Sequence, residues 1–340
     1  MRIICAAIVL SLAAFAASAQ NVKITPIGSH PGELCANDRA IVFEDPTGVR
    51  FLYDPAHNVT GGDDARLGTI HLVLLSHMHG DHVGDLKLKA PGAGTCANSD
   101  RVPAPNSTTA EVAAAKNAAL VMTRAMSGFV GNRVETIRGA GGKPINFCPQ
   151  TDGATTVPVA TVCSSQTDLG GVFVAKAANA ARAVEITIVP ASHVNNAPPA
   201  LLSEAYRAAF KADGAVFEYG PATGFVVKFT NGLTAYLTGD TAVFSEMRTV
   251  VNDFHKANLA VLNLGPNPGI FGSGAYAMNE LVRPASVILT HPNEPVTEGG
   301  KLRAGTRTAA LIKQLKAPAH LAISGRTMEF DGKGKCVAGC

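Results

Sequence analysis

Three imidazoles and one carboxylate lie within six residues, in the segment His77-Met78-His79-Gly80-Asp81-His82. The segment follows the apolar run 70–75, which is typical of a strand buried on both faces. Side chains two residues apart leave a strand on the same side, so His77 and His79 can share one cation, and Asp81 and His82 can reach a second. A histidine-rich tract can also arise by chance or collect metals at a surface. Its place directly after a buried strand favours a metal site, and imidazole and carboxylate ligands without thiolate suit zinc while tolerating iron or manganese.

The elements that must position this segment alternate between strand and helix. Short apolar or β-branched runs predict strands at 22–27, 40–44, 49–53, 70–75, 184–189, 224–229, 233–237, 259–264 and 287–289. Helical patterns lie at 242–254, 275–282 and 306–315. Because the two kinds of element are interleaved, we predict an α/β fold in which two sheets are sandwiched between helices.

The stretch from about 91 to 183 differs from the rest in composition. It is rich in Ala, Gly, Ser, Thr, Asn and Pro, and its one clear helical pattern covers 109–126. Long segments of this kind inside a compact domain are usually lids, binding loops or insertions. We therefore predict an insertion near the mouth of the site, held by one or more disulfides.

The six-residue motif resembles the H-x-H-x-D-H signature of the metallo-β-lactamase-fold hydrolases. The resemblance continues at three later positions, each of which follows an apolar strand: His193 in Ser192-His193, Asp240 in Gly239-Asp240 and His291 in Thr290-His291. It spans residues 22 to about 330, with the stretch 91–183 outside it. The fold that it implies is a four-layer αββα sandwich.

The resemblance also implies a set of metal ligands and a mechanism. One divalent cation would take His77, His79 and His193, the other would take Asp81, His82 and His291, and Asp240 would bridge the two. Two such cations, with zinc the expected metal, hold a shared water as hydroxide at neutral pH and polarise the scissile bond. Asp81 would in addition act in catalysis, because it can orient the hydroxide or pass its proton on.

Within this superfamily the sequence is most similar to the hydrolases related to ascorbate-6-phosphate lactonase. The parallels are Phe51-Leu52-Tyr53-Asp54-Pro55 before the motif and Leu281-Val282-Arg283-Pro284 before the last histidine, whereas Gly28-Ser29-His30 departs from the expected order. Asp54 could support a ligand imidazole or simply form a turn with the proline that follows it. The remaining histidines lack motif context and are expected at the surface or satisfied in the core: His57, His71, His255 and His320.

The start of the chain and its cysteines indicate export. Residues 1–19 form a basic start, an apolar run and an Ala-Ser-Ala end, which predict a signal peptide that leaves a hydrolase domain at 20–340. Six cysteines then remain, namely Cys35, Cys96, Cys148, Cys163, Cys336 and Cys340. An even number in an oxidising compartment predicts disulfides, although six cysteines allow 15 pairings and the sequence does not choose among them. We expect a periplasmic or secreted protein without a membrane anchor after cleavage.

Composition narrows the function further. Of the 340 residues, 46% are hydrophobic and 16% charged, and the formal net charge is +3, so disorder is excluded and nucleic acid is not an expected partner. We expect a dinuclear hydrolase of a small-molecule ester, lactone or phosphoester. The alternatives are a secreted zinc β-lactamase, which Asp240 disfavours because those enzymes usually use Cys or other ligands at the second site, and a non-catalytic metal-binding member of the fold.

Overall fold

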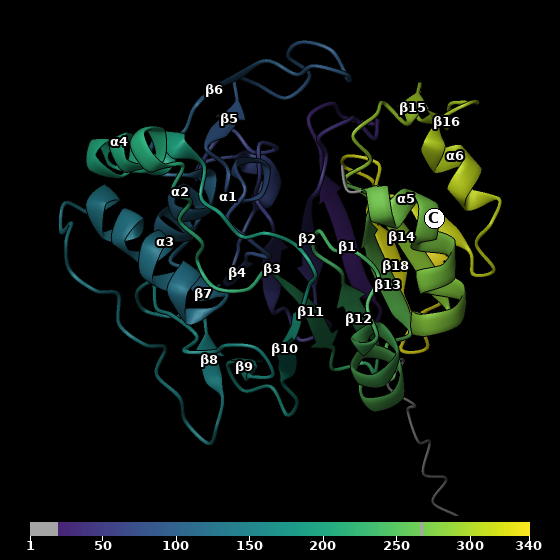
Figure 1. Ribbon diagram of the computed structural model, residues 1–340. Helices are drawn as coiled ribbons and strands as arrows, with labels where there is room; N and C mark the ends of the chain where they lie inside the picture. The colour runs from purple at the N-terminus through teal and green to yellow at the C-terminus, as the bar shows by residue number, and fades with distance from the viewer. Residues whose placement is uncertain (1–19, 266–267) are drawn as a thin grey trace, which may run out of the picture.

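Two sheets lie face to face with helices on both outer surfaces in the computed structural model, which describes residues 20–265 and 268–340 (Figure 1). In Figure 1 the helices up to residue 213 lie on one side of the sheets and the later helices lie on the other. The predicted four-layer αββα sandwich is therefore confirmed. The predicted signal peptide at 1–19 lies outside the described residues.

The first sheet contains seven strands in the order β19-β18-β1-β2-β3-β4-β7. Their bounds are β1 (Val22–Ile27), β2 (Ala40–Glu44), β3 (Arg50–Tyr53), β4 (Leu72–Leu74), β7 (Ala119–Val121), β18 (Met328–Phe330) and β19 (Cys336–Ala338). Strand β4 runs parallel to both of its neighbours, β3 and β7. All three of its side chains are buried, as its uninterrupted apolar run predicts for an interior parallel strand.

The second sheet contains eight strands in the order β17-β14-β13-β12-β11-β10-β9-β8. Their bounds are β8 (Thr155–Val157), β9 (Val172–Ala177), β10 (Val184–Pro190), β11 (Thr223–Lys228), β12 (Thr234–Leu237), β13 (Leu259–Asn263), β14 (Ser286–Thr290) and β17 (Ala319–Leu321). The four strands β12, β13, β14 and β17 are parallel, so their carboxyl ends meet at one edge of the sheet.

The main core lies between the sheets. Phe43 and Phe51 of the first sheet stack with ring centroids 4.7 Å apart, and Phe229, beside the second sheet, lies 5.9 Å from Phe51. Full burial of one such side chain stabilises the fold by about 1.5–3 kcal/mol. This contact between the layers fixes how the strand ends of one sheet sit relative to those of the other.

Two further apolar clusters attach the helices to the outer faces of the sheets. The α-helices are α1 (Gly80–Val83), α2 (Thr108–Lys116), α3 (Arg124–Ile137), α4 (Glu204–Asp213), α5 (Pro268–Tyr276) and α6 (Arg307–Ile312), with π-helical η3 (Met247–Phe254) and η4 (Ala277–Val282) and short 3-10 turns η1 (Ala65–Leu67) and η2 (Pro199–Leu201). Helices α2 and α3 pack on the first sheet, and η3, η4 and α6 pack on the second.

The prediction of a single helix over 109–126 is wrong, because two helices with a strand between them occupy that region. Helix α2 ends at Asn117, whose backbone is left-handed (φ 51°), and β7 follows and pairs with β4. The alanine-rich pattern hid the three residues of β7, which are fully buried at the sheet edge. Since β8 and β9 join the second sheet, the stretch 91–183 that we expected as an insertion is partly built into both sheets.

Two small hairpin sheets, β5 (Leu86–Leu88) with β6 (Arg101–Pro103) and β15 (Thr297–Glu298) with β16 (Lys301–Leu302), complete the fold.

The structure pairs the six cysteines left open by the sequence as Cys35–Cys96, Cys148–Cys163 and Cys336–Cys340. The first disulfide joins the loop after β1 to the stretch 91–183, and the second lies within that stretch. Among residues 20–265 and 268–340, no helix is both long and apolar enough to cross a membrane.

Candidate metal centre

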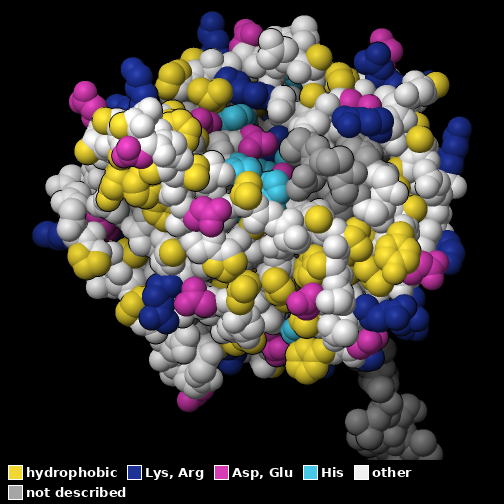
Figure 2. All heavy atoms as spheres, in the orientation of Figure 1, with side chains coloured by type: hydrophobic (Ala, Val, Ile, Leu, Met, Phe, Trp, Pro, Cys, Tyr) yellow, Lys and Arg dark blue, Asp and Glu magenta, His cyan; other side chains and the backbone are white. Residues whose placement is uncertain are grey.

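The candidate site lies where strand ends of both sheets meet. His77 follows β4, and His79 precedes the short helix α1, which carries Asp81 and His82. The other three candidates follow strands of the second sheet: His193 after β10, Asp240 after β12 and His291 after β14. Figure 2 shows histidine and acidic side chains together on the face where Figure 1 places α1. The structure thus brings together all seven side chains that the sequence nominated.

One group consists of imidazoles alone. His77, His79 and His193 each offer a ring nitrogen, and these atoms all lie within 4.8 Å of one another. Nδ1 of His79 faces Nε2 of His193 at 3.3 Å, while Nε2 of His79 contacts Oδ1 of Asn196 at 3.0 Å. The Asn196 contact favours the tautomer with its proton on Nε2, because an amide oxygen only accepts hydrogen bonds. The lone pair of Nδ1 is then directed at the group.

The second group contains a carboxylate. Asp81, His82 and His291 again have their ligand atoms within 4.8 Å of one another, and Nε2 of His291 lies 3.6 Å from Oδ2 of Asp81. Oδ2 of Asp240 lies 3.4 Å from Nε2 of His82 and 3.3 Å from Nε2 of His291. His77, His82 and Asp240 form a third group that overlaps both others. Asp240 therefore lies beside members of both groups.

The donor set fits divalent cations. Nε2 of His77, His82 and His291 is buried without a hydrogen-bond partner in each case. Burying an unsatisfied polar atom typically costs about 1–3 kcal/mol, so three such atoms facing one another and two carboxylates need a common partner. Imidazole nitrogen with carboxylate oxygen is a donor set that suits zinc.

Asp54 supports a histidine of the second group, which is one of the two roles that the sequence left open for it. It follows β3 in left-handed backbone (φ 42°), and its carboxylate lies 2.8 Å from Nδ1 of His82. Both the backbone N–H and the hydroxyl of Ser76 donate to the same carboxylate, at 2.8 and 2.7 Å, and Oγ of Ser76 also contacts Nδ1 of His77 at 3.0 Å. A carboxylate on Nδ1 keeps the ring proton there and leaves Nε2 free for a metal.

Sequence reasoning missed Arg39. Its side chain is fully buried and pairs with Oδ2 of Asp81, the oxygen that faces His291. Its Nε donates to the carbonyl oxygen of Asn37 at 3.3 Å, and Nη2 is buried without a partner. A single arginine at the start of a strand matches no motif, so only the fold reveals its role. Asn263, at the end of β13, was missed for the same reason: its amide donates to Oδ1 of Asp240 at 3.1 Å.

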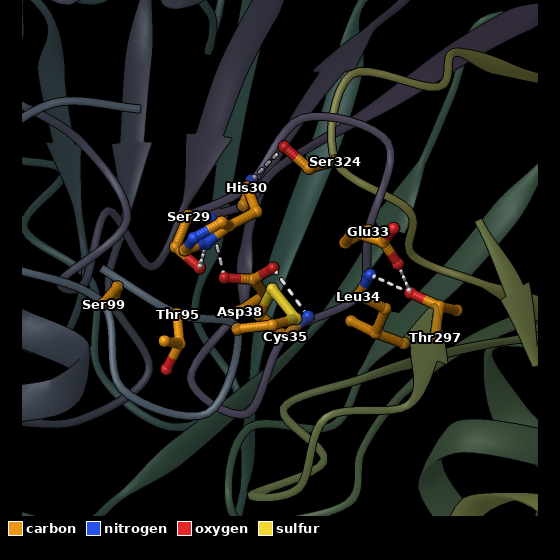
Figure 3. Close-up of a disulfide and its surroundings, with 12 residues drawn as sticks. Ser29, His30, Glu33, Leu34, Cys35, Asp38, Thr95, Ser99, Thr297 and Ser324 are labelled. Atoms are coloured by element: carbon orange, nitrogen blue, oxygen red, sulfur yellow. Dashed lines mark hydrogen bonds between the residues drawn. A yellow bond between two sulfur atoms is a disulfide. The ribbon is translucent and has the colours of Figure 1, made fainter. Parts of the chain in front are cut away.

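The loop that carries Arg39 also supports His291. The Asp38 carboxylate accepts from the backbone N–H groups of Ser29 and Cys35, at 2.7 and 2.9 Å, beside the Cys35–Cys96 disulfide (Figure 3). The Asp38 carbonyl in turn accepts from the backbone N–H of His291 at 2.8 Å. The disulfide-tied loop therefore positions both Asp81 and His291.

Burial and charge displace the pKa values of the group. Burial, reinforced by the neighbouring His82, holds the pKa of His77 well below its usual value. Burial alone would lower the pKa of His82, but the carboxylates of Asp240 and Asp54 outweigh it and raise that pKa to about 10. Burial would raise the pKa of Asp240, yet His291 and His82 hold it well below the usual range. A cation that binds here must replace the proton on His82, so binding releases protons.

The other histidines lie outside these three groups. His57 is buried and contacts the Asp85 carboxylate at 2.7 Å, and His71 accepts from the backbone N–H of Arg50 at 3.0 Å. His30 contacts the Ser29 hydroxyl at 3.3 Å, and His255 is partly exposed. His320 differs, since it belongs to a separate group with two cysteines.

The four layers, with histidine and aspartate side chains at the strand ends, define a metallo-β-lactamase fold, so the resemblance is confirmed at this level. No family model matches the chain. It is similar to proteins named UPF0173 metal-dependent hydrolase: one from Methanosphaera stadtmanae, 42% identical over 50 residues, and one from Pyrococcus abyssi, 24% identical over 224 residues. The first match covers 15% of this chain and about a fifth (21%) of that relative, and the second covers 66% and 67%.

A solved structure supports the fold. Igni18, described as a metallo hydrolase from Ignicoccus hospitalis, superposes with a TM-score of 0.53 at 19% identity, over 92% of this chain and 99% of Igni18.

Proposed function

We propose that this protein is a metal-dependent hydrolase that holds two divalent cations, with zinc the expected metal. One cation would take His77, His79 and His193, the other Asp81, His82 and His291, with Asp240 between them. The observation that carries the proposal is the convergence of these seven side chains into three overlapping groups around buried, unpartnered imidazole nitrogens. The printed names of the relatives, metal-dependent hydrolases, agree with it.

The chemistry of the bound cations would be that of a Lewis acid, which lowers the pKa of a water molecule and polarises the scissile bond. The chain's own residues would orient the cation ligands and the water molecule. Asp54 holds His82, and Asn263 holds Asp240, so both ligands are fixed before substrate arrives. The side chain of Asp81 is 36% exposed, whereas the side chain of Asp240 is 3% exposed. Asp81 is thus the carboxylate of the site that solvent reaches most easily. Burial would raise its pKa, but the Arg39 guanidinium holds that pKa well below the usual range, so Asp81 stays ionised and can orient a water molecule by accepting its hydrogen bond.

The expected substrate is a small-molecule ester, lactone or phosphoester, met outside the cytoplasm. The resemblance to the ascorbate-6-phosphate lactonase group supports the substrate class. The apolar run at 1–19 and the three disulfides support export, because disulfides persist in oxidising compartments. Mass spectrometry of protein from its native compartment tests export: an intact Met1 would contradict it.

Metal content and hydrolysis test the central proposal. The mature protein, expressed in metal-replete medium, is expected to hold close to two transition-metal ions per chain by elemental analysis. It is then screened against lactones, phosphodiesters, sulfate esters and β-lactams. Hydrolysis that chelation abolishes and zinc restores supports the proposal, whereas no bound metal would overturn it. Turnover of β-lactams alone would replace the substrate class with that of a zinc β-lactamase.

A further inference from the structure

A second cluster of metal-binding side chains lies far along the chain from the first. His320 belongs to β17, an edge strand of the eight-stranded sheet. Cys336 belongs to β19, an edge strand of the seven-stranded sheet. Cys340 follows four residues later. A ring nitrogen of His320 and the two sulfur atoms all lie within 4.8 Å of one another. The cluster therefore lies where edge strands of the two sheets come close to each other.

The imidazole of this cluster is prepared to act as a ligand. Nε2 of His320 is buried and has no hydrogen-bond partner, and its ring packs edge-on against Phe330 with centroids 5.8 Å apart. Burial lowers the pKa of His320, so the ring is neutral at neutral pH and its lone pair is available. A neutral imidazole beside two sulfur atoms is part of a donor set that structural zinc sites use.

The two cysteines form a disulfide in the structure, but this bond connects positions only four residues apart. It leaves His320 without a partner and does not tie the two sheets together. Cys340 is exposed and Cys336 is partly exposed, so a thiol reductant can reach the bond. The sulfur atoms of both residues lie against the carbonyl oxygen of Ala338, at 3.4 and 3.3 Å, where thiols would donate hydrogen bonds.

We propose that His320, Cys336 and Cys340, in their dithiol form, bind one thiophilic divalent cation such as Zn²⁺ or Cd²⁺. Two thiols of a reductant are oxidised to a disulfide as the Cys336–Cys340 bond is reduced to two thiols. Cation binding then releases two protons and leaves two thiolates and one neutral imidazole as ligands, with a fourth position open to water. Unlike the disulfide, the cation links β17 to β19 and so connects the two sheets. This proposal shares no residue with the candidate metal centre and does not depend on its function.

Cadmium absorbance tests the site directly, because the other centre offers only nitrogen and oxygen donors. A sulfur-to-cadmium charge-transfer band therefore reports thiolate ligands alone. The reduced full-length protein is expected to gain this band with one Cd²⁺ per chain, and the oxidised protein to show none. Reduced protein that binds Cd²⁺ without the band would overturn the proposal.

Variants identify the ligands. The Cys336→Ser/Cys340→Ser double variant, reduced in parallel, is expected to lose the band while the His77→Ala variant keeps it. A band that persists in the double variant would place the thiolates at the other four cysteines and overturn the proposal. His320→Ala is expected to weaken Cd²⁺ binding at least 10-fold, and unchanged affinity would remove the imidazole from the site. Circular dichroism checks that each variant folds, and the oxidised wild-type protein serves as a control without any substitution.

Discussion

The two halves of the candidate metal centre are built on different electrostatics. The half formed by His77, His79 and His193 contains imidazoles only, supported by neutral groups such as the amide of Asn196 and the hydroxyl of Ser76. The half formed by Asp81, His82 and His291 is surrounded by charge: Asp54 lies behind His82, and Arg39 pairs with Asp81.

The difference teaches how each half would respond to change. Neutral ligands hold a cation through geometry, so the first half should fail when an imidazole is removed. In the second half the negative charges offset the cation, so it should fail when a charge is altered even if the shape is kept. Asp240 belongs to both halves, because it contacts His82 and His291 and shares a group with His77.

The largest effect should come from His77→Ala. His77 belongs to the imidazole group, so its loss should release the first cation, and hydrolysis, which needs both cations, should be abolished. Elemental analysis and the turnover of any substrate identified by the screen measure the two effects. His255→Ala is the matched control and should be nearly silent. Retention of both cations by the His77 variant would show that His77 is not a ligand.

Asp240→Asn should have the next largest effect on metal content and hydrolysis. The change keeps size but removes the charge, so we expect preferential loss of the second cation and a rate about 100-fold lower, with little change in thermal stability. Metal stoichiometry and melting temperature decide between this and a structural role. A variant that keeps both cations and turns over normally, or one that only melts earlier, would show that Asp240 is not the bridge.

Asp54→Asn should weaken one half selectively. Without the carboxylate on Nδ1, His82 loses its fixed orientation, and affinity for one of the two cations should fall about 10–100-fold. Competition with a coloured chelator measures both affinities. Asp85→Asn, which alters the carboxylate on His57 outside the three groups, is the control. Equal weakening of both cations would contradict the division into halves.

Arg39→Met should affect stability more than chemistry. It leaves Asp81 unpaired, and because that carboxylate is partly exposed the loss should be about 2 kcal/mol, below the range for fully buried pairs. Arg39→Lys should recover part of it. Urea unfolding of the metal-free protein measures both changes. If Arg39→Met is as stable as the wild type, the buried ion pair does not hold Asp81 in place.

The smallest effect should come from His71, which contacts the sheet but belongs to none of the three groups of candidate ligands. Burial and the nearby Arg50 lower its pKa in the folded protein below the unfolded value, and its Nδ1 accepts from the Arg50 backbone. The stabilisation is therefore complete above the unfolded pKa of about 6.5 and declines as the pH falls toward the lower folded value. His71→Asn offers an acceptor that does not protonate, so its melting temperature should fall less between pH 7.5 and 5.5. Equal falls in variant and wild type would contradict this.

The layers were accessible from the sequence because strands and helices follow from local patterns, and the seven candidate side chains were accessible through the six-residue motif and the resemblance to the metallo-β-lactamase-fold hydrolases. Apolar runs ahead of His77, His193 and His291 mark buried strands, and the ends of these strands lie at the same end of the two-sheet sandwich. The same reasoning failed at 119–121, where an alanine-rich context hid a three-residue strand that exists only through its pairing with β4.

Only the tertiary structure decided the supporting contacts. Arg39 pairs with a residue 42 positions away, and Cys35 bonds with a residue 61 positions away, so neither contact leaves a local periodicity to detect. His320 and Cys336 meet because their strands are the last of two different sheets, which no spacing in the sequence encodes. The position of a candidate ligand at a strand end is determined by its neighbours along the chain, which form the strand. The residues that contact this ligand are determined by which distant segments pack against it, and that packing depends on burial of the whole core.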